Sequence, residues 1–240
     1  PDRSPLSSRI VTLGGEAWLG PAWLLSATVY HRSTRGLVLP DPTPGLVVQR
    51  SPLVEGRVRA RGVDVSLRRL AGRVTGSLAY SLGDARARGA GLDFPAPTDR
   101  RHVIDVTMET RLTRGLDLAA AWVLATGAPY TRTLERCVGE GCRPAALLDR
   151  PFGRRSPTYR SLDLVLDWTH RFGSWSVGGF LQARNVLGHD NAVTYTNTEE
   201  SCIGGVFENG VCSGGGRPSS KDAFTPGIPT IPLLGLRVTF

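Results

Sequence analysis

The sequence has almost no lysine and no long apolar run. Its single lysine is Lys221, so the formal charge of +8 rests almost wholly on arginine. The arginines are spread along the chain and no nucleic-acid recognition motif accompanies them, which argues against nucleic acid as a partner. The longest apolar run covers residues 118–125, well short of the roughly 18 residues that a membrane-spanning helix needs. A helical membrane protein is therefore excluded.

Histidine and cysteine are also scarce, with four of each. No Ser/His/Asp constellation or nucleophile elbow is present, so the sequence gives no support for an enzyme. The cysteines form two close pairs, Cys137 with Cys142 and Cys202 with Cys212. Neither pair has C-x-x-C spacing and neither segment holds a histidine, so we expect no zinc and no other cofactor. Two local disulfides are the favoured interpretation, and four free thiols are the alternative.

The chain has no obvious start. It begins Pro1-Asp2-Arg3, without a methionine or a charged-then-apolar leader. An export signal would then lie upstream or have been removed, and we expect the chain to be a fragment of a longer protein. The 29 glycines and 17 prolines lie mostly between alternating segments, which is typical of many strands joined by turns and loops.

The clearest pattern that is present runs from residue 159 to residue 191. Large apolar residues alternate there with polar ones, and a short turn at residues 171–174 separates two such runs. This period predicts a hairpin with one apolar and one polar face. In a soluble β-sandwich the apolar face would be the core, yet here the polar face carries charges at the successive inward positions Asp163, Asp167 and Arg184. A wet interior with lipid outside explains the pattern better.

The same alternation recurs along the rest of the chain. The segments are residues 9–13, 22–32, 63–67, 74–80, 104–112, 116–124 and 234–240. With the two strands of the hairpin they make nine strands. Aperiodic, glycine- and proline-containing segments at residues 35–56, 83–99, 127–157 and 188–229 are predicted to be loops.

The connections between these strands alternate between short and long. Outer-membrane barrels have short turns on one side, long loops on the other, and strands that are apolar outside and polar inside. The sequence therefore predicts an all-β fold, a transmembrane antiparallel β-barrel. Because single-chain barrels have an even number of strands, nine strands predict that part of a larger barrel is missing from the chain.

Several short motifs lie in this framework. They are Gly62-Val-Asp64, Ala79-Tyr-Ser81, Thr98-Asp-Arg-Arg-His102, Thr126-Gly-Ala-Pro-Tyr-Thr131, Tyr159-Arg-Ser-Leu-Asp163, Ala183-Arg-Asn-Val-Leu187 with Asn191, and Leu236-Arg-Val-Thr-Phe240. In order and spacing they resemble the C-terminal part of the barrel of a TonB-dependent receptor. The resemblance covers residues 58–240 and is extended to the whole chain, 1–240.

This resemblance implies a 22-stranded barrel in the bacterial outer membrane, plugged by an N-terminal domain. The chain carries neither that plug nor the energy-coupling box before it, so it is not expected to transport alone. The implied function is active uptake of a scarce, bulky nutrient such as a ferric siderophore or similar chelate. The implied partners are the outer-membrane lipid bilayer, the plug of the same protein, the inner-membrane energy-coupling complex, the barrel-assembly machinery and a small-molecule ligand. A passive porin and a secreted β-sandwich glycan-binding module remain the alternatives.

The barrel pattern and the resemblance together nominate site residues. Six charged residues are predicted to face the lumen and to contact the plug or ligand: Asp105, Glu109, Asp163, Asp167, Arg184 and Arg237. The last four are also interpreted as pairing with one another or with the plug. Phe240 is expected to serve barrel assembly, and His102 to anchor a strand end. Lipid contact is predicted for Val106, Met108, Leu164, Leu166, Leu236 and Val238, and a lipid-interface position for Trp23, Trp122, Trp168 and Trp175.

Overall fold

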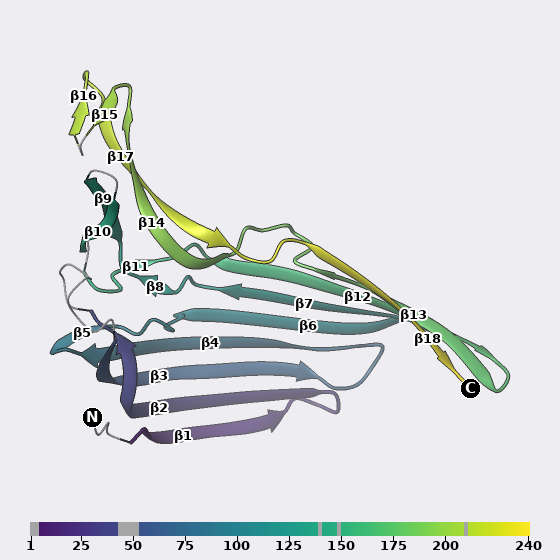
Figure 1. The fold of residues 1–240 in the computed structure, drawn as a ribbon. Helices are drawn as coiled ribbons and strands as arrows, with labels where there is room; N and C mark the ends of the chain where they lie inside the picture. The colour runs from purple at the N-terminus through teal and green to yellow at the C-terminus, as the bar shows by residue number, and fades with distance from the viewer. Residues whose placement is uncertain (1–4, 43–52, 139–140, 148–149, 209–210) are drawn as a thin grey trace.

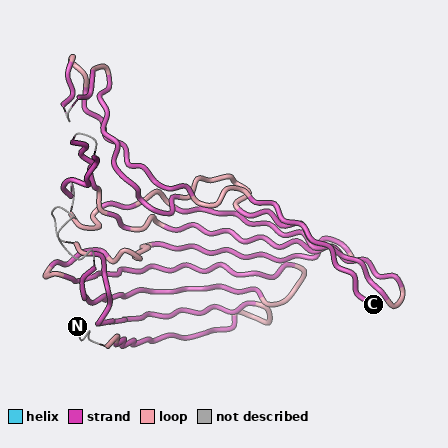
Figure 2. Tube along the Cα trace, in the orientation of Figure 1, coloured by secondary structure: helices cyan, strands magenta, loops and turns pink. Residues whose placement is uncertain are grey.

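The computed structural model describes residues 5–42, 53–138, 141–147, 150–208 and 211–240. All regular secondary structure in these residues is β-strand (Figure 2). Within the same ranges, no helix has the length and apolar character needed to cross a membrane.

Nine strands lie side by side in one antiparallel sheet (Figure 1). In order across the sheet they are β1 (Ser7–Trp18), β2 (Trp23–Pro40), β3 (Leu53–Arg69), β4 (Val74–Gly89), β6 (His102–Thr113), β7 (Leu116–Ala125), β12 (Tyr159–Phe172), β13 (Trp175–Arg184) and β18 (Ile231–Thr239). The short β5 (Leu92–Pro95) folds back onto β4. The nine strands expected from the sequence are therefore those of the main sheet, and the all-β antiparallel prediction is confirmed.

The two ends of this sheet differ. At the turn end, residues 19–22, 70–73, 114–115 and 173–174 join successive strands. The chain reverses there through glycines with positive φ, such as Gly115 (81°) and Gly173 (58°), a conformation that costs glycine little. At the loop end the connections are long (Figure 1).

The loop end contains strands of its own. They are β8 (Pro129–Tyr130), β9 (Thr133–Val138), β10 (Gly141–Leu147), β11 (Arg154–Arg155), β14 (Ala192–Ile203), β15 (Val206–Glu208), β16 (Val211–Ser213) and β17 (Arg217–Pro226). The antiparallel β14 and β17 form a long hairpin that projects beyond the main sheet, with β15 and β16 at its tip (Figure 1). The prediction that residues 127–157 and 188–229 are simple loops is wrong, because strand pairing continues there without a regular apolar period.

The main strands also extend further than expected at the loop end. β2 continues to Pro40, β3 starts at Leu53 and β4 runs to Gly89, all inside segments predicted to be loops. The alternation disappears there because arginines replace the apolar residues at alternate positions. The backbone ladder needs no such alternation, and β3 stays paired with β4 up to Gly56 and Gly89.

Strand register sorts the side chains of the sheet onto two faces. Residues paired directly across antiparallel strands share a face: Leu166 lies opposite both Leu118 and Leu181. The apolar face so defined includes Leu13, Val29, Val63, Leu78, Val106, Met108, Trp122, Leu164, Leu166, Leu181, Leu236 and Val238. Many of these side chains stay exposed, with Leu236 81% accessible.

The opposite, polar face carries small or hydrophilic residues. Asp163 and Asp167 of β12 lie on this face. Thr107 of β6 and Ser77 of β4 lie on it too, directly opposite each other on neighbouring strands. The hydroxyl groups of Ser77 and Thr107 are 2.8 Å apart and hydrogen-bonded. The sheet therefore has one polar face and one apolar face. In the described residues, no second layer of protein covers the apolar face.

The apolar cluster that is buried lies at the loop end. Leu39, Ala87, Phe94 and Ala96 form it, and the Phe152 ring stacks on Phe94 with centroids 5.2 Å apart. These residues come from β2, β4, the β4–β6 connection and the β7–β12 connection. The cluster therefore packs two long connections against the ends of β2 and β4.

Candidate functional site

All six predicted lumen residues lie on the polar face. Strand register places Asp105 and Glu109 on β6, Asp163 and Asp167 on β12, Arg184 on β13 and Arg237 on β18. Their contact with a plug or a ligand stays a prediction.

Four of these residues form two ion pairs between neighbouring or nearby strands. Arg237 Nη2 lies 3.1 Å from Asp167 Oδ1, and Arg184 Nε lies 3.4 Å from Asp163 Oδ2. Both arginine side chains are more than half exposed, so each pair contributes little to stability, about 0–1 kcal/mol. Asp105 and Glu109, in contrast, form no ion pair with any described residue.

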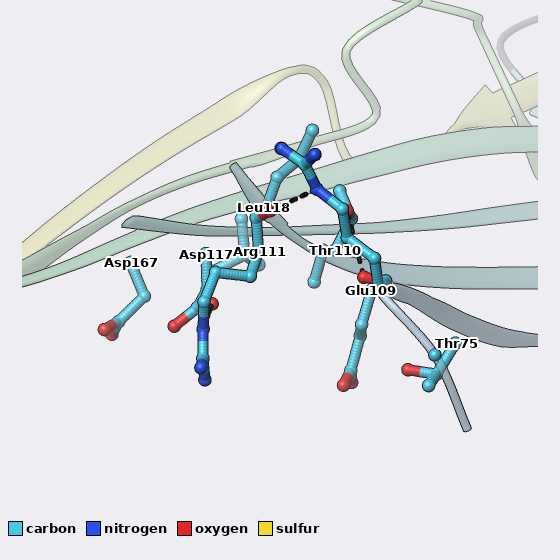
Figure 3. A pocket seen from close by; sticks show the side chains of 11 residues that line it. Thr75, Glu109, Thr110, Arg111, Asp117, Leu118 and Asp167 are labelled. Carbon is cyan, nitrogen blue, oxygen red and sulfur yellow. Dashed lines mark hydrogen bonds and ion pairs between the residues drawn. The ribbon is translucent and has the colours of Figure 1, made fainter. Parts of the chain in front are cut away.

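Glu109 borders a hollow of about 590 Å³ near the turn end (Figure 3). The side chains of Glu109, Asp117 and Asp167 are directed to the same side of the sheet there. Arg111 pairs with Asp117 at 3.1 Å, while Arg73 donates hydrogen bonds to the backbone carbonyls of Arg111 and Leu112. Asp167 is paired with Arg237, so among the carboxylates that border the hollow Glu109 is the one without an ion pair in the described residues, and it can accept a cationic side chain.

A second polar cluster lies where β12 and β13 reach the loop end. Asn185, at positive φ (49°), donates its backbone N–H to Asp163 Oδ1 at 2.8 Å. Asn191 closes the ladder of β12, because its side-chain amide accepts from the N–H and donates to the C=O of Arg160. Asn185 and Asn191, which belong to one of the motifs behind the family resemblance, therefore hold the ends of β12 and β13 in place. A cavity of about 260 Å³ opens beside it, lined in part by Arg100 and Tyr159.

A third cluster joins two long connections that are far apart in the chain. Asp222 of β17 accepts hydrogen bonds from the Tyr130 hydroxyl, from Arg132 Nε at 2.9 Å and from Thr198 Oγ1 at 2.8 Å. Burial raises the pKa of Asp222, but the hydrogen bonds from Tyr130 and Thr198 and the Arg132 charge outweigh it and hold that pKa below its usual value. Burial and the bond to Asp222 raise the pKa of Tyr130.

Aromatic rings extend this cluster. The Tyr195 ring stacks on Tyr130 with centroids 4.6 Å apart, and Phe224 meets Tyr130 edge-on at 5.3 Å. A cavity of about 550 Å³ lies beside them, lined by residues of several long connections and by the end of β2, among them Phe152 and Pro40. Sequence reasoning missed this site, because only the fold brings Tyr130 and Asp222, 92 residues apart, together.

The base of the loop end is clamped by a buried ion pair. Asp99, 2% exposed, pairs with Arg155 and accepts a hydrogen bond from the backbone N–H of Ala85 at 2.8 Å. Arg155 Nη1 also donates to the carbonyls of Asp99 and Gly127, both at 3.0 Å. Because Asp99 is buried, removing Arg155 would leave the charge of Asp99 uncompensated.

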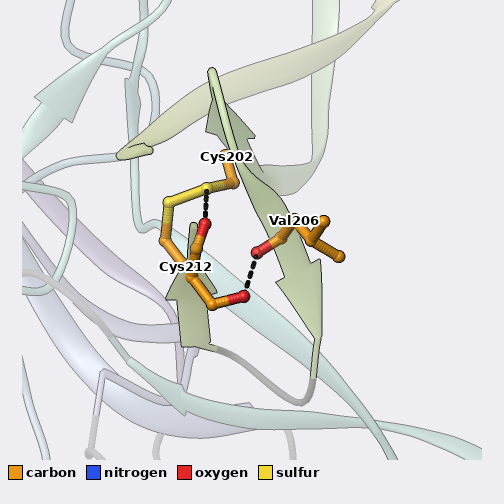
Figure 4. The surroundings of a disulfide bond; sticks show 4 residues. Cys202, Val206 and Cys212 are labelled. Carbon is orange, nitrogen blue, oxygen red and sulfur yellow. Dashed lines mark hydrogen bonds between the residues drawn. A yellow bond between two sulfur atoms is a disulfide. The ribbon is translucent and has the colours of Figure 1, made fainter. Parts of the chain in front are cut away.

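The second cysteine pair forms the predicted disulfide. Cys202 and Cys212 are bonded, with Cα atoms 5.4 Å apart, across the tip of the β14–β17 hairpin (Figure 4). For the first pair, the backbone of β9 and β10 places Cys142 directly opposite Cys137. Their side chains lie outside the described residues, so that disulfide stays a prediction.

The remaining nominated residues lie at the two ends of the sheet. His102 begins β6 at the loop end, where its Nδ1 is 2.8 Å from the Tyr80 hydroxyl. At the turn end, Trp175 stacks on Phe172 with centroids 4.7 Å apart. Phe240 follows β18 and is 98% exposed.

No protein-family model and no curated protein matches the sequence. Among solved structures, the chain is similar to the closed form of the ferric-catecholate import receptor Fiu of E. coli K12, with a TM-score of 0.53 and 13% identity. The similarity covers 98% of this chain and 27% of that receptor, so the chain spans about a quarter of the receptor's length. At this identity the likeness establishes a shared fold alone, that of part of a β-barrel.

Proposed function

We propose that this chain is part of the barrel of a TonB-dependent outer-membrane receptor that takes up a scarce, bulky nutrient, such as a ferric siderophore or a similar chelate. The observation that carries the proposal is the two-faced sheet. Nine antiparallel strands share one exposed apolar face and one polar face that bears ion pairs. The likeness of fold to a ferric-catecholate import receptor supports the same assignment.

Lipid is the environment that suits the apolar face. A soluble protein rarely exposes a contiguous apolar patch of more than a few hundred Å², whereas here the large apolar side chains of adjacent strands form one surface, from Leu13 of β1 to Leu236 of β18. A transmembrane barrel places such a surface against the hydrocarbon and its polar face inward. A β-sandwich would need a second sheet over the apolar face.

In this proposal the two faces and the two ends have separate roles. The carboxylates of Asp105 and Glu109, which lack an ion pair among the described residues, would meet cationic groups of the plug. The aromatic cavity beside Tyr130 and Tyr195 would lie at the outer mouth, where an arriving ligand first meets the protein. The inner-membrane coupling complex would act through the N-terminal part of the full protein, and no catalysis or cofactor is involved.

The test is uptake by the full-length protein. We expect it to restore uptake of a ⁵⁵Fe-labelled ferric catecholate in cells that lack their own receptors, and only when the coupling complex is present. The matched control is the same strain without that complex. Uptake that persists in the control and is limited only by solute size would support a passive porin instead. A protein that is soluble without detergent would support the sandwich module.

A further inference from the structure

Arginines replace the apolar residues abruptly at the loop end of β1 to β4, on the apolar face. Register defines successive cross-strand rows. The last apolar row is Leu13, Val29, Val63 and Leu82. The next row toward the loop end is Val11, His31, Arg61 and Asp84. It is followed by the row of Arg9, Ser33, Arg59 and Arg86, and then by the row of Arg35, Arg57 and Arg88. We call the seven arginines and His31 the basic border.

The charge of the basic border is only partly balanced. Asp84 lies 2.6 Å from Arg101 and 3.6 Å from Arg61, and Asp93 lies 2.7 Å from Arg86. Glu55, on the same face near Arg57, has no ion pair in the described part of the chain. Five of the seven arginines of the basic border also have no ion pair with a described residue: Arg9, Arg35, Arg57, Arg59 and Arg88.

Like charges are paired directly across strands in this patch. Arg57 lies between Arg35 and Arg88, and Arg59 lies opposite Arg86. Such pairs destabilise a sheet, so a bound anion would offset a cost that the bare protein carries. Two hollows of about 520 and 630 Å³ separate the side chains, one bordered by Arg9, Arg35 and Arg59 and the other by Arg35, Arg57 and Arg88.

Position and charge together select the ligand. The basic rows continue the apolar face directly, so a molecule that fits both has an apolar part on Val29 and Val63 and an anionic part on the arginines. Arginine binds phosphate in a bidentate manner. With strands about 4.8 Å apart, the row from Arg35 to Arg88 spans about 10 Å, enough for a headgroup with more than one phosphate. A soluble anion would gain nothing from the apolar rows.

We infer that the basic border binds the phosphate groups of membrane lipids whose headgroups lie level with the loop end of the sheet. This inference rests on the proposed membrane location and adds a specific lipid contact to it. It assigns a ligand to the outer surface of the sheet, separate from the transport path on the polar face.

The test is lipid binding by the full-length protein in detergent, followed by native mass spectrometry. The probes are diphosphoryl lipid A, monophosphoryl lipid A, phosphatidylcholine and inorganic pyrophosphate. We expect diphosphoryl lipid A to bind most tightly, monophosphoryl lipid A less tightly and phosphatidylcholine less tightly still. Inorganic pyrophosphate should bind weakly. Arg59→Gln with Arg88→Gln should weaken diphosphoryl lipid A binding about tenfold or more. Arg59→Lys with Arg88→Lys should retain part of it.

The matched control removes two arginines from the other end of the molecule. Arg114 and Arg171 are exposed near the turns, so Arg114→Gln with Arg171→Gln changes the net charge equally and should leave lipid binding unchanged. Equal weakening by both double variants, binding that ignores the phosphates, or pyrophosphate binding as tight as that of the lipid would overturn the inference. The assay needs no uptake. If the unsubstituted protein takes up its ligand but binds no lipid A, the basic border alone is contradicted; if it binds lipid A but does not take up ligand, the transport proposal alone is contradicted.

Discussion

At the scale of single residues, the polar face is shaped by aromatic rings that cover glycines on neighbouring strands. Tyr30 of β2 lies opposite Gly62 of β3, which lies opposite Gly83 of β4. A Cβ added at Gly62 would come within 2.6 Å of the Tyr30 hydroxyl and of the Leu82 carbonyl. Phe180 covers Gly235 in the same way. Glycine is needed at these positions because a ring and a backbone approach closely.

We expect Gly62→Ala to destabilise the folded protein by about 1–3 kcal/mol, because the methyl group overpacks against Tyr30 and the Leu82 carbonyl. Gly15→Ala is the control, since a Cβ there meets nothing within 4 Å. Guanidinium unfolding of the full-length protein in lipid vesicles measures both. The packing account fails if the two variants lose the same stability.

Asp222 makes the attachment of the outer hairpin pH-dependent. Its folded-state pKa lies below the ordinary 3.8, so its contribution is fully present above about pH 4 and is lost as the pH falls through the folded-state value. We expect several-fold faster amide hydrogen exchange in residues 192–226 at pH 3 than at pH 6, after correction for intrinsic rates. In Asp222→Asn this difference should shrink. An unchanged difference in the variant would remove Asp222 as the cause.

Tyr130 sets the opposite limit of the same cluster. Its folded-state pKa is raised above the ordinary 10.0, so the protonated hydroxyl and its bond to Asp222 are fully stabilising below about pH 10 and are lost only above it. Across the neutral range the cluster therefore stays intact.

At the scale of elements, the alternation of apolar and polar residues was the part of the fold that sequence could predict. Alternation identified all nine main strands because each has a face of one polarity, as Leu164 and Asp163 of β12 illustrate. It failed beyond the apolar rows, where Arg57 and Arg59 stand at positions that carry valine further along β3. Backbone hydrogen bonds between strands hold these segments together, and such bonds produce no pattern of apolar and polar residues in the sequence.

The candidate site was predictable to the same extent. Face assignment followed from the period, so the charged residues of the polar face could be named. Partners could not, since Asp167 and Arg237 meet only through the pairing of three strands. The Tyr130 and Asp222 cluster depends on the contact of two long connections, which no local pattern encodes.

The two faces can be distinguished by arginine substitution. We expect Leu164→Arg, on the apolar face near the middle of β12, to cost about 2–4 kcal/mol, because a charge there enters hydrocarbon. Thr107→Arg, on the polar face of β6, should cost less. Both are measured by unfolding of the full-length protein from phospholipid vesicles, and equal costs would contradict lipid on the apolar side.

At the scale of the whole molecule, the sheet is open. β1 and β18 lie at opposite edges, and in the described residues each pairs on one side only (Figure 1). An unpaired backbone edge in hydrocarbon costs several kcal/mol for each unsatisfied group. In the proposed receptor both edges must therefore pair with strands of the remaining barrel, so that closure is a property of the full protein.

Phe240 bears on how that closure is reached. It follows the edge strand β18 and is 98% exposed, so it contributes almost no packing to the folded sheet. Its contacts in this chain are lost at almost no cost, so we expect an effect of its removal to arise when β18 assembles with the remaining barrel. We expect deletion of Phe240 from the full-length protein to lower the amount of heat-modifiable, folded receptor in the outer membrane, while the ligand affinity of the folded fraction stays unchanged.

The control is Phe240→Tyr, which keeps an aromatic ring at this position and should assemble normally. Quantitative immunoblotting of unheated and heated membrane fractions gives the folded amount, and ligand titration of the purified folded fraction gives the affinity. Reduced affinity with normal assembly would place Phe240 in the ligand site. Normal values of both would show that Phe240 has no part in barrel closure, which would then depend on the pairing of β18 alone.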